Sequence, residues 1–387
     1  MPLEDPFVYH VEWYDPSSSL HRQFNMSFYT SDNSVELYDL KTKKLFLRRC
    51  QAGPITKKDL FIGNTIVVYS RHLLIKNFAN DYTRSQVEDA KQSMLILIYP
   101  ESHSELGRIL DCFESAGHAI CRARSVRFTL TSAREFFDRL FVKGHDTRED
   151  IQRLSNPSCP SVAFEIIGSK IISHWKSCLR PSVQFEEDSQ NYLNHRGIYG
   201  SKSIADADWE LDFVFNPKNI RVQPEPPVKS RFQNVTCCVI KPNAVRQGLS
   251  GRIIEDIQAK GFHVLGLQSV VLTKKETEDF YEIYKGIPNA DYAGMVREGS
   301  NGRSLVLALG PGGSIQFNEH CPNIVEALRQ ICGTPHDPEV CRVLYPESLR
   351  AKYGGITPEG NAVHCSDLEE DGILEVEYFF SLIQLYA

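Results

Sequence analysis

The stretch LGRILDCFESAGHAI at residues 106–120 matches SGRIIEDIQAKGFHV at residues 250–264 without a gap. The match continues upstream, where MLILIYPE at 94–101 parallels TCCVIKPN at 236–243. Downstream of it, RSVRFTLTSAREFF parallels QSVVLTKKETEDFY. Because a long self-match at a nearly fixed offset is typical of duplicated structural units, the chain is predicted to contain two copies of one domain.

Each copy follows the same pattern of apolar residues. An apolar run ends at a proline, an amphipathic stretch follows, and a second apolar run comes after a glycine. In the second copy Ile253, Ile254 and Ile257 stand at helical spacing, which predicts the order strand, helix, strand. LVLAL at 305–309 predicts another buried strand and NIVEALRQI at 323–331 a helix. Together these elements indicate a ferredoxin-like β-α-β-β-α-β unit.

A last echo of the repeat closes each copy. ELDFVF at 210–215 parallels EVEYFF at 375–380. Both are short apolar runs, and we expect each to be the closing strand of its copy. An acidic residue, Glu210 or Glu375, opens each run.

The remaining sequence divides around the two copies. Residues 1–90 contain short runs rich in β-branched and aromatic residues, such as FVYHVEWY and TIVVYS, separated by turn residues, which predicts a small β-rich domain. The prolines of RVQPEPPVKS predict an extended linker at 221–232. The fold class is therefore α+β, with the first copy at 91–220 and the second at 233–387.

Composition narrows the classes of function. Of the 387 residues, 42% are hydrophobic and 24% are charged, as in folded globular proteins. The formal net charge of −6 disfavours a nucleic-acid binder, which needs basic residues against phosphates. Eleven cysteines without regular spacing, and a start without a secretory signal, predict free thiols in a reducing compartment and no metal bound by cysteine. No apolar stretch approaches the roughly 20 residues that span a bilayer, so no membrane is expected.

The residues that point to chemistry lie in the second copy. Its first strand ends at Lys241, and the segment GNAVHCSD places Asn361 and His364 three residues apart. At this point the chain resembles the nucleoside diphosphate kinases, strongly over about residues 233–387 and weakly over 91–220. In that family the histidine of an Asn-x-x-His-x-Ser-Asp segment takes the γ-phosphate of a nucleoside triphosphate and passes it to a diphosphate. The resemblance implies ATP and nucleoside diphosphates as ligands, with Mg²⁺ arriving on the nucleotide.

The resemblance also implies roles for individual residues. The catalytic set that it implies comprises the nucleophile His364, the orienting carboxylate Glu375, and Lys241 and Tyr284 near the transferred phosphate. Ser366 matches the serine that stands beside the histidine in the family. The nucleotide-binding set that it implies comprises Lys241, Tyr292, Arg329, Thr334, Arg350 and Asn361. No side chain is expected to ligate a metal directly.

These residue types suit phosphoryl transfer. The reaction mainly requires that the nucleophile and the phosphate be correctly positioned, and that cations stabilise the negative charge spreading over the phosphate oxygens. Two arginines and a lysine supply these cations. A neutral imidazole attacks at a pH of about 7 without prior proton removal, and the phosphoimidazole is labile enough to pass the group on. Glu375 is expected to fix the tautomer by accepting a hydrogen bond from the other ring nitrogen.

Some of these roles have competitors in the sequence. Tyr281 is a rival for the role of Tyr284, and Glu377 is a rival for that of Glu375. Each residue taken alone also has a structural interpretation, because a lone histidine, lysine or arginine is usually a surface residue. GPGGS at 310–314 is predicted to be a plain turn, because no Gly-Lys-Ser/Thr follows it.

The first copy departs from the pattern of the second. Tyr99 stands where the lysine is expected, and no histidine precedes the closing run, with Ser203 as the nearest counterpart. Lys176 stands in the place of an arginine, and Glu210 has nothing to orient. We therefore expect the first copy to be noncatalytic and structural. In the second copy Cys365 replaces the family's glycine after the histidine, which favours reduced activity.

The order of a β-rich module, a decayed copy and an intact copy is similar to that of family members found in cilia and at centrosomes. That resemblance implies a location in the cytoplasm and cytoskeleton, at the ciliary or flagellar axoneme or the centrosome. It implies tubulin of doublet microtubules and the γ-tubulin complex as partners. Two functions follow: a nucleoside diphosphate kinase active in the C-terminal domain only, or a structural axonemal microtubule-associated protein with little or no catalysis. We expect the fused copies to pair within one chain rather than build the family's usual hexamer.

Overall fold

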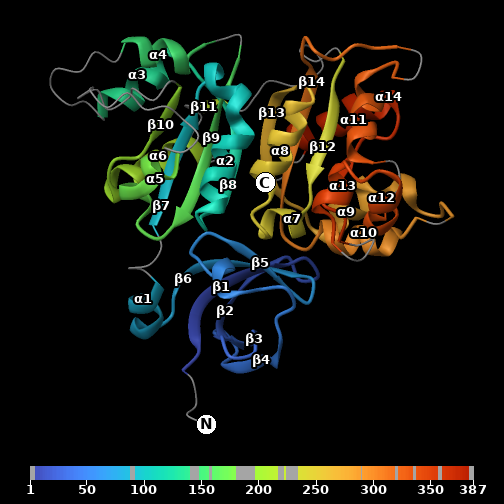
Figure 1. The fold of residues 1–387 in the computed structure, drawn as a ribbon. Helices are drawn as coiled ribbons and strands as arrows, with labels where there is room; N and C mark the ends of the chain where they lie inside the picture. The colour runs from blue at the N-terminus through green and yellow to red at the C-terminus, as the bar shows by residue number, and fades with distance from the viewer. Residues whose placement is uncertain are drawn as a thin grey trace. The chain divides into compact units, whose positions relative to one another are not determined.

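The computed structural model contains two compact units (Figure 1). One unit comprises residues 1–92 with 271–303, and the other comprises residues 93–270 with 304–387. The residues that the structure describes are 5–87, 92–139, 148–156, 159–179, 197–216, 222–223, 234–288, 290–318, 321–333, 337–355 and 360–382. Most of the linker predicted at 221–232 lies outside them.

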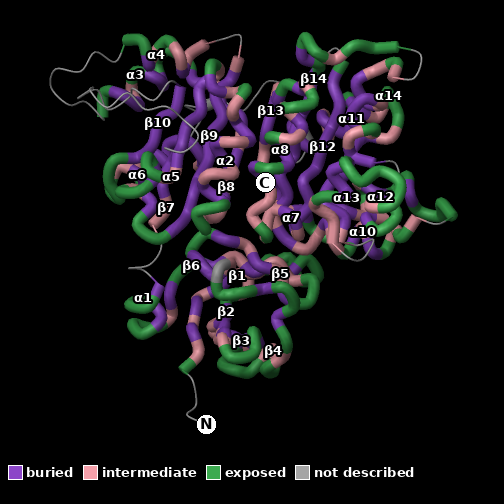
Figure 2. The backbone as a smooth tube through the Cα atoms, viewed as in Figure 1, coloured by how far each residue is buried: buried purple, intermediate pink, exposed green. Residues whose placement is uncertain are grey.

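The first unit contains a six-stranded antiparallel sheet with the order β4-β3-β2-β1-β6-β5. Its strands are β1 (Phe7–Asp15), β2 (Leu20–Tyr29), β3 (Ser34–Asp39), β4 (Lys44–Gln51), β5 (Thr65–Val68) and β6 (Arg71–Phe78). Alternate residues point to opposite faces of a strand, and Tyr9 and Val11 of β1 share a buried face with Phe24 and Met26 of β2. Figure 2 colours the residues by burial, and along β1 and β2 buried residues alternate with intermediate ones. The predicted β-rich N-terminal region is confirmed.

The same unit includes helices from two parts of the chain. They are α1 (Asp81–Val87), α9 (Lys274–Phe280), the 3₁₀ turn η4 (Glu282–Tyr284) and α10 (Tyr292–Gly299). Helix α9 begins in a capping box, in which the Thr273 hydroxyl accepts from the Glu276 N–H (3.2 Å) and the Glu276 carboxylate accepts from the Thr273 N–H (2.7 Å). Arg303 donates to the Asn64 side chain (3.1 Å), which ties this segment to the strands of the unit.

The second unit holds both copies of the repeat in one sheet with the order β10-β7-β9-β8-β13-β14-β12-β15, and β11 (Val222–Gln223) pairs with β8. The strands of the first copy are β7 (Gln92–Ile98), β8 (Ala119–Phe128), β9 (Ser161–Gly168) and β10 (Ile198–Gly200). Those of the second copy are β12 (Thr236–Ile240), β13 (Phe262–Val271), β14 (Arg303–Pro311) and β15 (Val363–Cys365). Counted within each copy, the order is 4-1-3-2 both times, so the predicted ferredoxin-like units and the α+β class are confirmed.

Helices cover the sheet of the second unit. In the first copy they are α2 (Leu106–Ser115), α3 (Leu130–Arg139), α4 (Arg148–Leu154), α5 (Ile171–Leu179) and α6 (Ile204–Phe215). In the second copy they are α7 (Pro242–Arg246), α8 (Ser250–Ala259), α11 (Ile324–Cys332), α12 (Pro338–Leu344), α13 (Leu349–Tyr353) and α14 (Glu369–Glu377). Among the described residues, none of the helices combines the length and apolar character needed to cross a membrane.

The prediction that each copy closes with a strand is wrong, because both closing segments are helices, α6 and α14. Helix α6 has Ser203 as its N-cap, whose hydroxyl accepts from the Asp206 N–H (3.1 Å). Helix α14 carries Glu369, Glu370 and Asp371 in its first turn, where negative charge is favourable. These N-terminal signals outweigh the strand-like alternation of the aromatic residues that follow.

Helices α2 and α8, which are the matching helices of the repeat, pack against each other through one glycine each. A Cβ on Gly107 would lie 2.1 Å from the backbone N of Glu255, and a Cβ on Gly251 would lie 2.1 Å from the backbone N of Asp111. Two backbones approach this closely only where neither residue has a side chain. The two copies therefore pair within one chain, as expected from the duplication.

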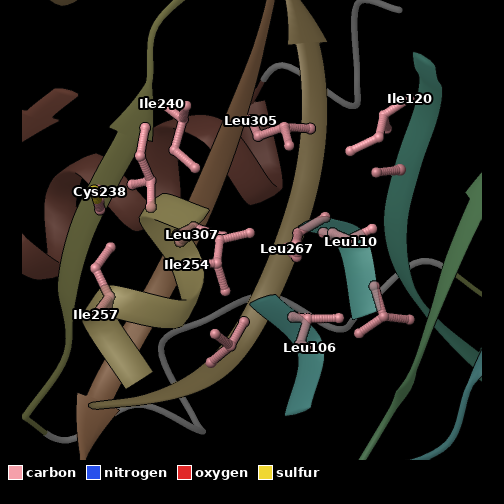
Figure 3. Close-up of a cluster of buried hydrophobic side chains, with 14 of the residues drawn as sticks. Leu106, Leu110, Ile120, Cys238, Ile240, Ile254, Ile257, Leu267, Leu305 and Leu307 are labelled. Atoms are coloured by element: carbon pink, nitrogen blue, oxygen red, sulfur yellow. The ribbon is translucent and has the colours of Figure 1, made fainter. Parts of the chain in front are cut away.

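Hydrogen bonds and apolar packing repeat this reciprocal contact. The N–H of Gly107 donates to Gln258 Oε1 (2.9 Å), and the N–H of Gly251 donates to Glu114 Oε2 (2.7 Å). Figure 3 shows Leu106 and Leu110 of α2 in the same buried cluster as Ile254 and Ile257 of α8, together with Ile120, Cys238, Ile240, Leu267, Leu305 and Leu307 of the strands. The two copies thus share one hydrophobic core.

The close approach of α2 and α8 gives a stability prediction. In Gly251→Ala the added Cβ would overlap backbone atoms of the facing helix, and such overpacking is expected to lower the free energy of unfolding by roughly 3 kcal/mol. The measurement is urea denaturation of the whole chain. Gly313→Ala is the matched control, because no heavy atom lies within 4 Å of a Cβ there. Equal unfolding midpoints for the two variants would contradict the close packing.

Glu114 at the same contact gives a pH prediction. Burial raises the pKa of its carboxyl from 4.5 to about 7. Between these values the folded state keeps a proton that the unfolded chain has lost, so the free energy of unfolding falls as the pH rises from 4.5 to about 7. Glu114→Gln cannot titrate, and its stability is expected to fall less than that of the wild type across this interval.

Urea denaturation at several pH values within the interval measures this difference between the variant and the wild type. Glu105→Gln is the control, because the Glu105 side chain is 43% exposed. It should keep the pH dependence of the wild type. Parallel pH profiles for Glu114→Gln and the wild type would show that Glu114 does not hold the raised pKa.

Candidate active site

The pairing of β15 with β12 fixes the direction of the His364 side chain. Strand β15 lies at the edge of the sheet and pairs antiparallel with β12, so that His364 lies opposite Val239 and Cys365 opposite Cys238. The His364 side chain is only 3% exposed. Since residues alternate between the two faces of a strand, Cys365 points away from the face that carries His364.

His364 is bonded to a carboxylate that is itself held by a hydroxyl. Its Nε2 lies 3.0 Å from Oε1 and 3.1 Å from Oε2 of Glu375 on α14. The Ser366 hydroxyl donates to Glu375 Oε2 (2.8 Å) and accepts from the Cys237 N–H (3.1 Å). A carboxylate can only accept, so Nε2 carries the ring proton and Nδ1 keeps its lone pair. Nδ1 is therefore the nucleophilic atom of this imidazole.

Two opposing effects act on the pKa of His364. Burial by itself lowers this pKa, because it disfavours the charged ring. The charge of Glu375 and its hydrogen bond to the ring raise it, and the net pKa lies above the ordinary 6.5. The neutral ring that can act as a nucleophile therefore predominates only at a pH above that value.

The structure brings Glu375, and not its rival Glu377, to His364. Both residues belong to the last turn of α14. Two residues apart on a helix correspond to about 200° around the axis, so the two side chains point in different directions. Glu375 is the one that is buried against the histidine, at 8% exposure.

Lys241 and Asn361 stand at one end of the β12–β15 pairing. Lys241 directly follows β12, and its backbone N–H donates to the carbonyl of Ala362 (2.9 Å). Asn361 is buried, and its side-chain oxygen accepts from the Val363 N–H (3.3 Å). Lys241 is only 5% exposed, which excludes its interpretation as an ordinary surface lysine at a strand end.

The two predicted arginines approach the same segment from α11 and α13. Arg350 is 3% exposed, and it donates to the carbonyl of Gly333 (2.5 Å) and to the sulfur of Cys365 (3.7 Å). Arg329, in the last turn of α11, forms an ion pair with Asp367. Thus Lys241, Arg329, Arg350, His364 and Glu375 all belong to or contact one stretch of chain, residues 361–367.

The other predicted residues lie in the first unit or outside the described residues. Tyr284 and its rival Tyr281 are both buried in the first unit, with ring centroids 5.9 Å apart, so burial does not choose between them. Tyr292 begins α10 in the same unit, and its hydroxyl donates to the carbonyl of Glu278 (3.4 Å). Thr334 lies outside the described residues. The roles of these residues stay predictions.

In the first copy Tyr199 occupies the place that His364 has in the second. Strand β10 pairs with β7 in the same register in which β15 pairs with β12. The hydroxyls of Tyr199 and Ser201 both donate to Glu210, that of Ser201 at 2.5 Å. The expectation that Glu210 has nothing to orient is therefore wrong.

Ser203 is not the counterpart of the histidine, because it serves as the N-cap of α6. The sequence does contain a signal that identifies Tyr199 as the counterpart of His364. Tyr199 stands 11 residues before Glu210, and His364 stands 11 residues before Glu375. A tyrosine and a histidine give little similarity, and only the register of the short strand shows that they are equivalent.

Aromatic side chains fill the site of the first copy. Tyr99, which stands where the lysine is expected, and Tyr199 are both buried. The ring of Tyr199 meets that of Phe136 edge-on, with centroids 5.6 Å apart. Burial, with the nearby charge of Glu210, raises the pKa of the Tyr199 phenol well above its ordinary value. The phenol stays protonated, and a protonated phenol is a poor nucleophile.

Comparison with known proteins shows the family to which the chain belongs. A family model described as nucleoside diphosphate kinase matches residues 234–385. Nucleoside diphosphate kinase homolog 7 of Mus musculus is 35% identical over 390 residues, covering 97% of this chain and 93% of the mouse protein, and that of Rattus norvegicus is 34% identical over 389 residues with the same coverage. The nucleoside diphosphate kinase of Geotalea daltonii is 31% identical over 150 residues, covering 39% of this chain and 97% of that protein. The rodent proteins therefore match the module and both copies.

The contact between His364 and Glu375 gives a titration prediction. In Glu375→Gln the charge that raises the pKa of His364 is lost while its burial remains. Because one close charge typically shifts a pKa by about 1 to 3 units, the pKa of His364 is expected to fall at least about 1 unit below that of the wild type. The measurement is an NMR titration of the His364 ring. Glu377→Gln is the matched control and should leave the pKa unchanged. An equal effect of both substitutions on the pKa of His364 would contradict the specific contact between Glu375 and the histidine.

Proposed function

Because the chain belongs to the nucleoside diphosphate kinase family, we propose that its second copy transfers the γ-phosphate of ATP to nucleoside diphosphates through a phosphohistidine at His364. The observation that carries this proposal is the buried bond between Nε2 of His364 and Glu375, which leaves the lone pair on Nδ1. The lysine and both arginines that the reaction needs contact the same seven-residue stretch, 361–367.

The chemistry takes two steps at one nitrogen. In the first, the Nδ1 lone pair forms a bond to the γ-phosphorus as the bond to the bridging oxygen breaks, and the nucleoside diphosphate leaves. In the second, a terminal oxygen of the acceptor diphosphate attacks the same phosphorus, and the bond to Nδ1 breaks. Throughout both steps the proton stays on Nε2, which donates its hydrogen bond to Glu375. The charge of Glu375 stabilises the positive charge that the phosphorylated ring acquires.

The cations act on the charge of the transferred group. Lys241, Arg329 and Arg350 would donate to phosphate oxygens, whose negative charge spreads in the transition state. Arg350 and Lys241 are almost fully buried, so their charges act in a medium of lower dielectric constant than water. This placement strengthens their interaction with a bound phosphate.

Magnesium fits the site as a ligand of the nucleotide. The carboxylates of Glu375 and Asp367 are already engaged by His364, Ser366 and Arg329. Among the described residues, no group of three or more His, Cys, Asp or Glu side chains is arranged to hold a metal ion. Phosphate oxygens and water would hold Mg²⁺, which would neutralise part of the phosphate charge.

A structural role is the second candidate function. It is favoured by the first copy, which keeps the whole 4-1-3-2 sheet while buried tyrosines fill the place of its chemistry. We propose that the chain also serves as an axonemal or centrosomal component in the cytoplasmic cytoskeleton, with tubulin of doublet microtubules or the γ-tubulin complex as its partner. The similarity to proteins with the same module and two copies supports this proposal.

Phosphohistidine labelling tests the enzyme. Wild-type chain incubated with γ-labelled ATP and Mg²⁺ is expected to gain acid-labile, alkali-stable label, and added GDP should remove the label as GTP. His364→Ala should gain none. His263→Ala is the control, because His263 is an exposed histidine of the same copy and should label like the wild type. Equal labelling of His364→Ala and the wild type would contradict the proposal.

The localisation of the same variants in ciliated cells tests the structural role. The His364→Ala chain is expected to reach the axoneme or centrosome like the wild type, whereas a chain without residues 1–90 should not. Loss of localisation in His364→Ala would make catalysis, rather than binding, the primary role. Normal localisation of the shortened chain would show that the module is not the anchor.

A further inference from the structure

Asp367 belongs to the segment that carries the nucleophile, yet the transfer reaction as described assigns it no task. Its side chain forms an ion pair with Arg329. We infer that Asp367 is a positioning residue, which holds the guanidinium of Arg329 in place for a nucleotide phosphate. The inference rests on the proposed function, because it concerns how the same site binds its nucleotide.

The contacts of residues 364–367 divide between two sets of partners. His364 and Ser366 bond to Glu375. Cys365 and Asp367 contact the two arginines instead, Cys365 through its sulfur and Asp367 through its carboxylate. Alternation along β15 separates His364 from Cys365, and Asp367 follows in a bend beyond the strand. One short segment thus positions the nucleophile through its even-numbered residues and the cations through its odd-numbered ones.

The position of Asp367 is itself well fixed. The preceding residue, Ser366, is bonded through its backbone to Cys237 of β12 and through its hydroxyl to Glu375. The following residue, Leu368, is the N-cap of α14. A carboxylate held between a strand and a helix N-terminus has little freedom to follow a moving partner. Arg329 has the longer side chain of the pair, so the ion pair restricts the conformation of Arg329 rather than that of Asp367.

The ion pair leaves part of the Arg329 guanidinium for a ligand. Nη1 bonds to Asp367, and Nε lies 3.7 Å from the carboxylate of Glu326. Within the described part of the chain, Nη2 makes no hydrogen bond. The Arg329 and Asp367 side chains are 23% and 26% exposed, so the pair is half-buried and less screened than a surface pair. A planar guanidinium held at Nη1 and Nε presents its remaining nitrogen, Nη2, in a fixed direction.

Arg350 provides an internal comparison. Its guanidinium is buried and donates to a backbone carbonyl and a sulfur, so the packing around it fixes its conformation. Arg329 is more exposed, and a mobile arginine would lose side-chain entropy on binding a phosphate. The carboxylate of Asp367 supplies to the exposed arginine the restriction that burial supplies to the other.

The test is nucleotide binding and turnover by Asp367→Asn. Without the ion pair, Arg329 must be ordered on binding, and this side-chain ordering is expected to raise the Kd for fluorescent N-methylanthraniloyl-ADP about 5- to 10-fold. The KM for nucleotide should rise in parallel, while kcat changes less than about 2-fold, because the interaction acts in the ground state and the transition state alike. Asp367→Glu, which keeps the charge, should restore most of the affinity.

A double-mutant cycle separates this role from a structural one. Arg329→Gln combined with Asp367→Asn should bind the probe no more weakly than Arg329→Gln alone, because Asp367 acts only through the arginine. Asp371→Asn is the control. Asp371 stands four residues further in the same acidic stretch and bonds to the Leu368 N–H, so its removal changes the charge equally without touching Arg329.

The outcomes distinguish the two proposals. Unchanged probe affinity in Asp367→Asn, or strictly additive losses in the cycle, would overturn the positioning role. An equal loss in Asp371→Asn would also overturn it, because a general effect of charge would then explain the result. Since probe binding is read without turnover, a wild type that binds the probe but forms no phosphohistidine would refute the kinase while the role of Asp367 is still decided. A wild type that binds no probe would overturn the role of Asp367 as well.

Discussion

The register of β15 on β12 determines that His364, and not Cys365, points toward Glu375. A slip by one residue would turn His364 away from Glu375 and put Cys365 in its place, because side chains alternate with a period of two. Strand β15 has only three residues, and so short a ladder specifies its register weakly. The Ser366 hydroxyl adds the missing restraint, because it accepts from the Cys237 N–H of β12 and donates to Glu375 of α14.

The first copy contains the same hydrogen-bonded serine, although its site, in the part of the chain that the structure describes, has no histidine. There the Ser201 hydroxyl accepts from the Leu95 N–H (2.9 Å) and donates to Glu210. The serine and glutamate therefore join a strand to a helix in both copies, whether or not chemistry follows. What differs is the residue two places before the serine, a buried tyrosine in one copy and the histidine in the other. This explains how the fold persists in a copy that has a tyrosine in place of the histidine.

The glycine contact between α2 and α8 explains why the first copy has kept its fold. Gly107 and Gly251 bring the two backbones together, and the apolar side chains around them form one core that both copies share. Damage to the first copy would therefore remove packing from the second, because protein interiors are dense and tolerate voids poorly. The first copy therefore remains under the constraint of supporting its neighbour.

The sequence by itself determined the duplication, the β-α-β-β-α-β order before the closing segment of each copy, the β-rich start, and the segment that carries His364, because all of these are local patterns at fixed spacings. Three features were decided only by the tertiary structure. EVEYFF alternates like a strand, yet it belongs to the helix α14 and its aromatic continuation, so the choice of Glu375 over Glu377 needed the helix. Tyr199 replaced histidine without similarity of residue type. The ion pair of Asp367 with Arg329 joins positions 38 residues apart, and no periodicity along a chain reports a contact that arises only when β15 and α11 meet.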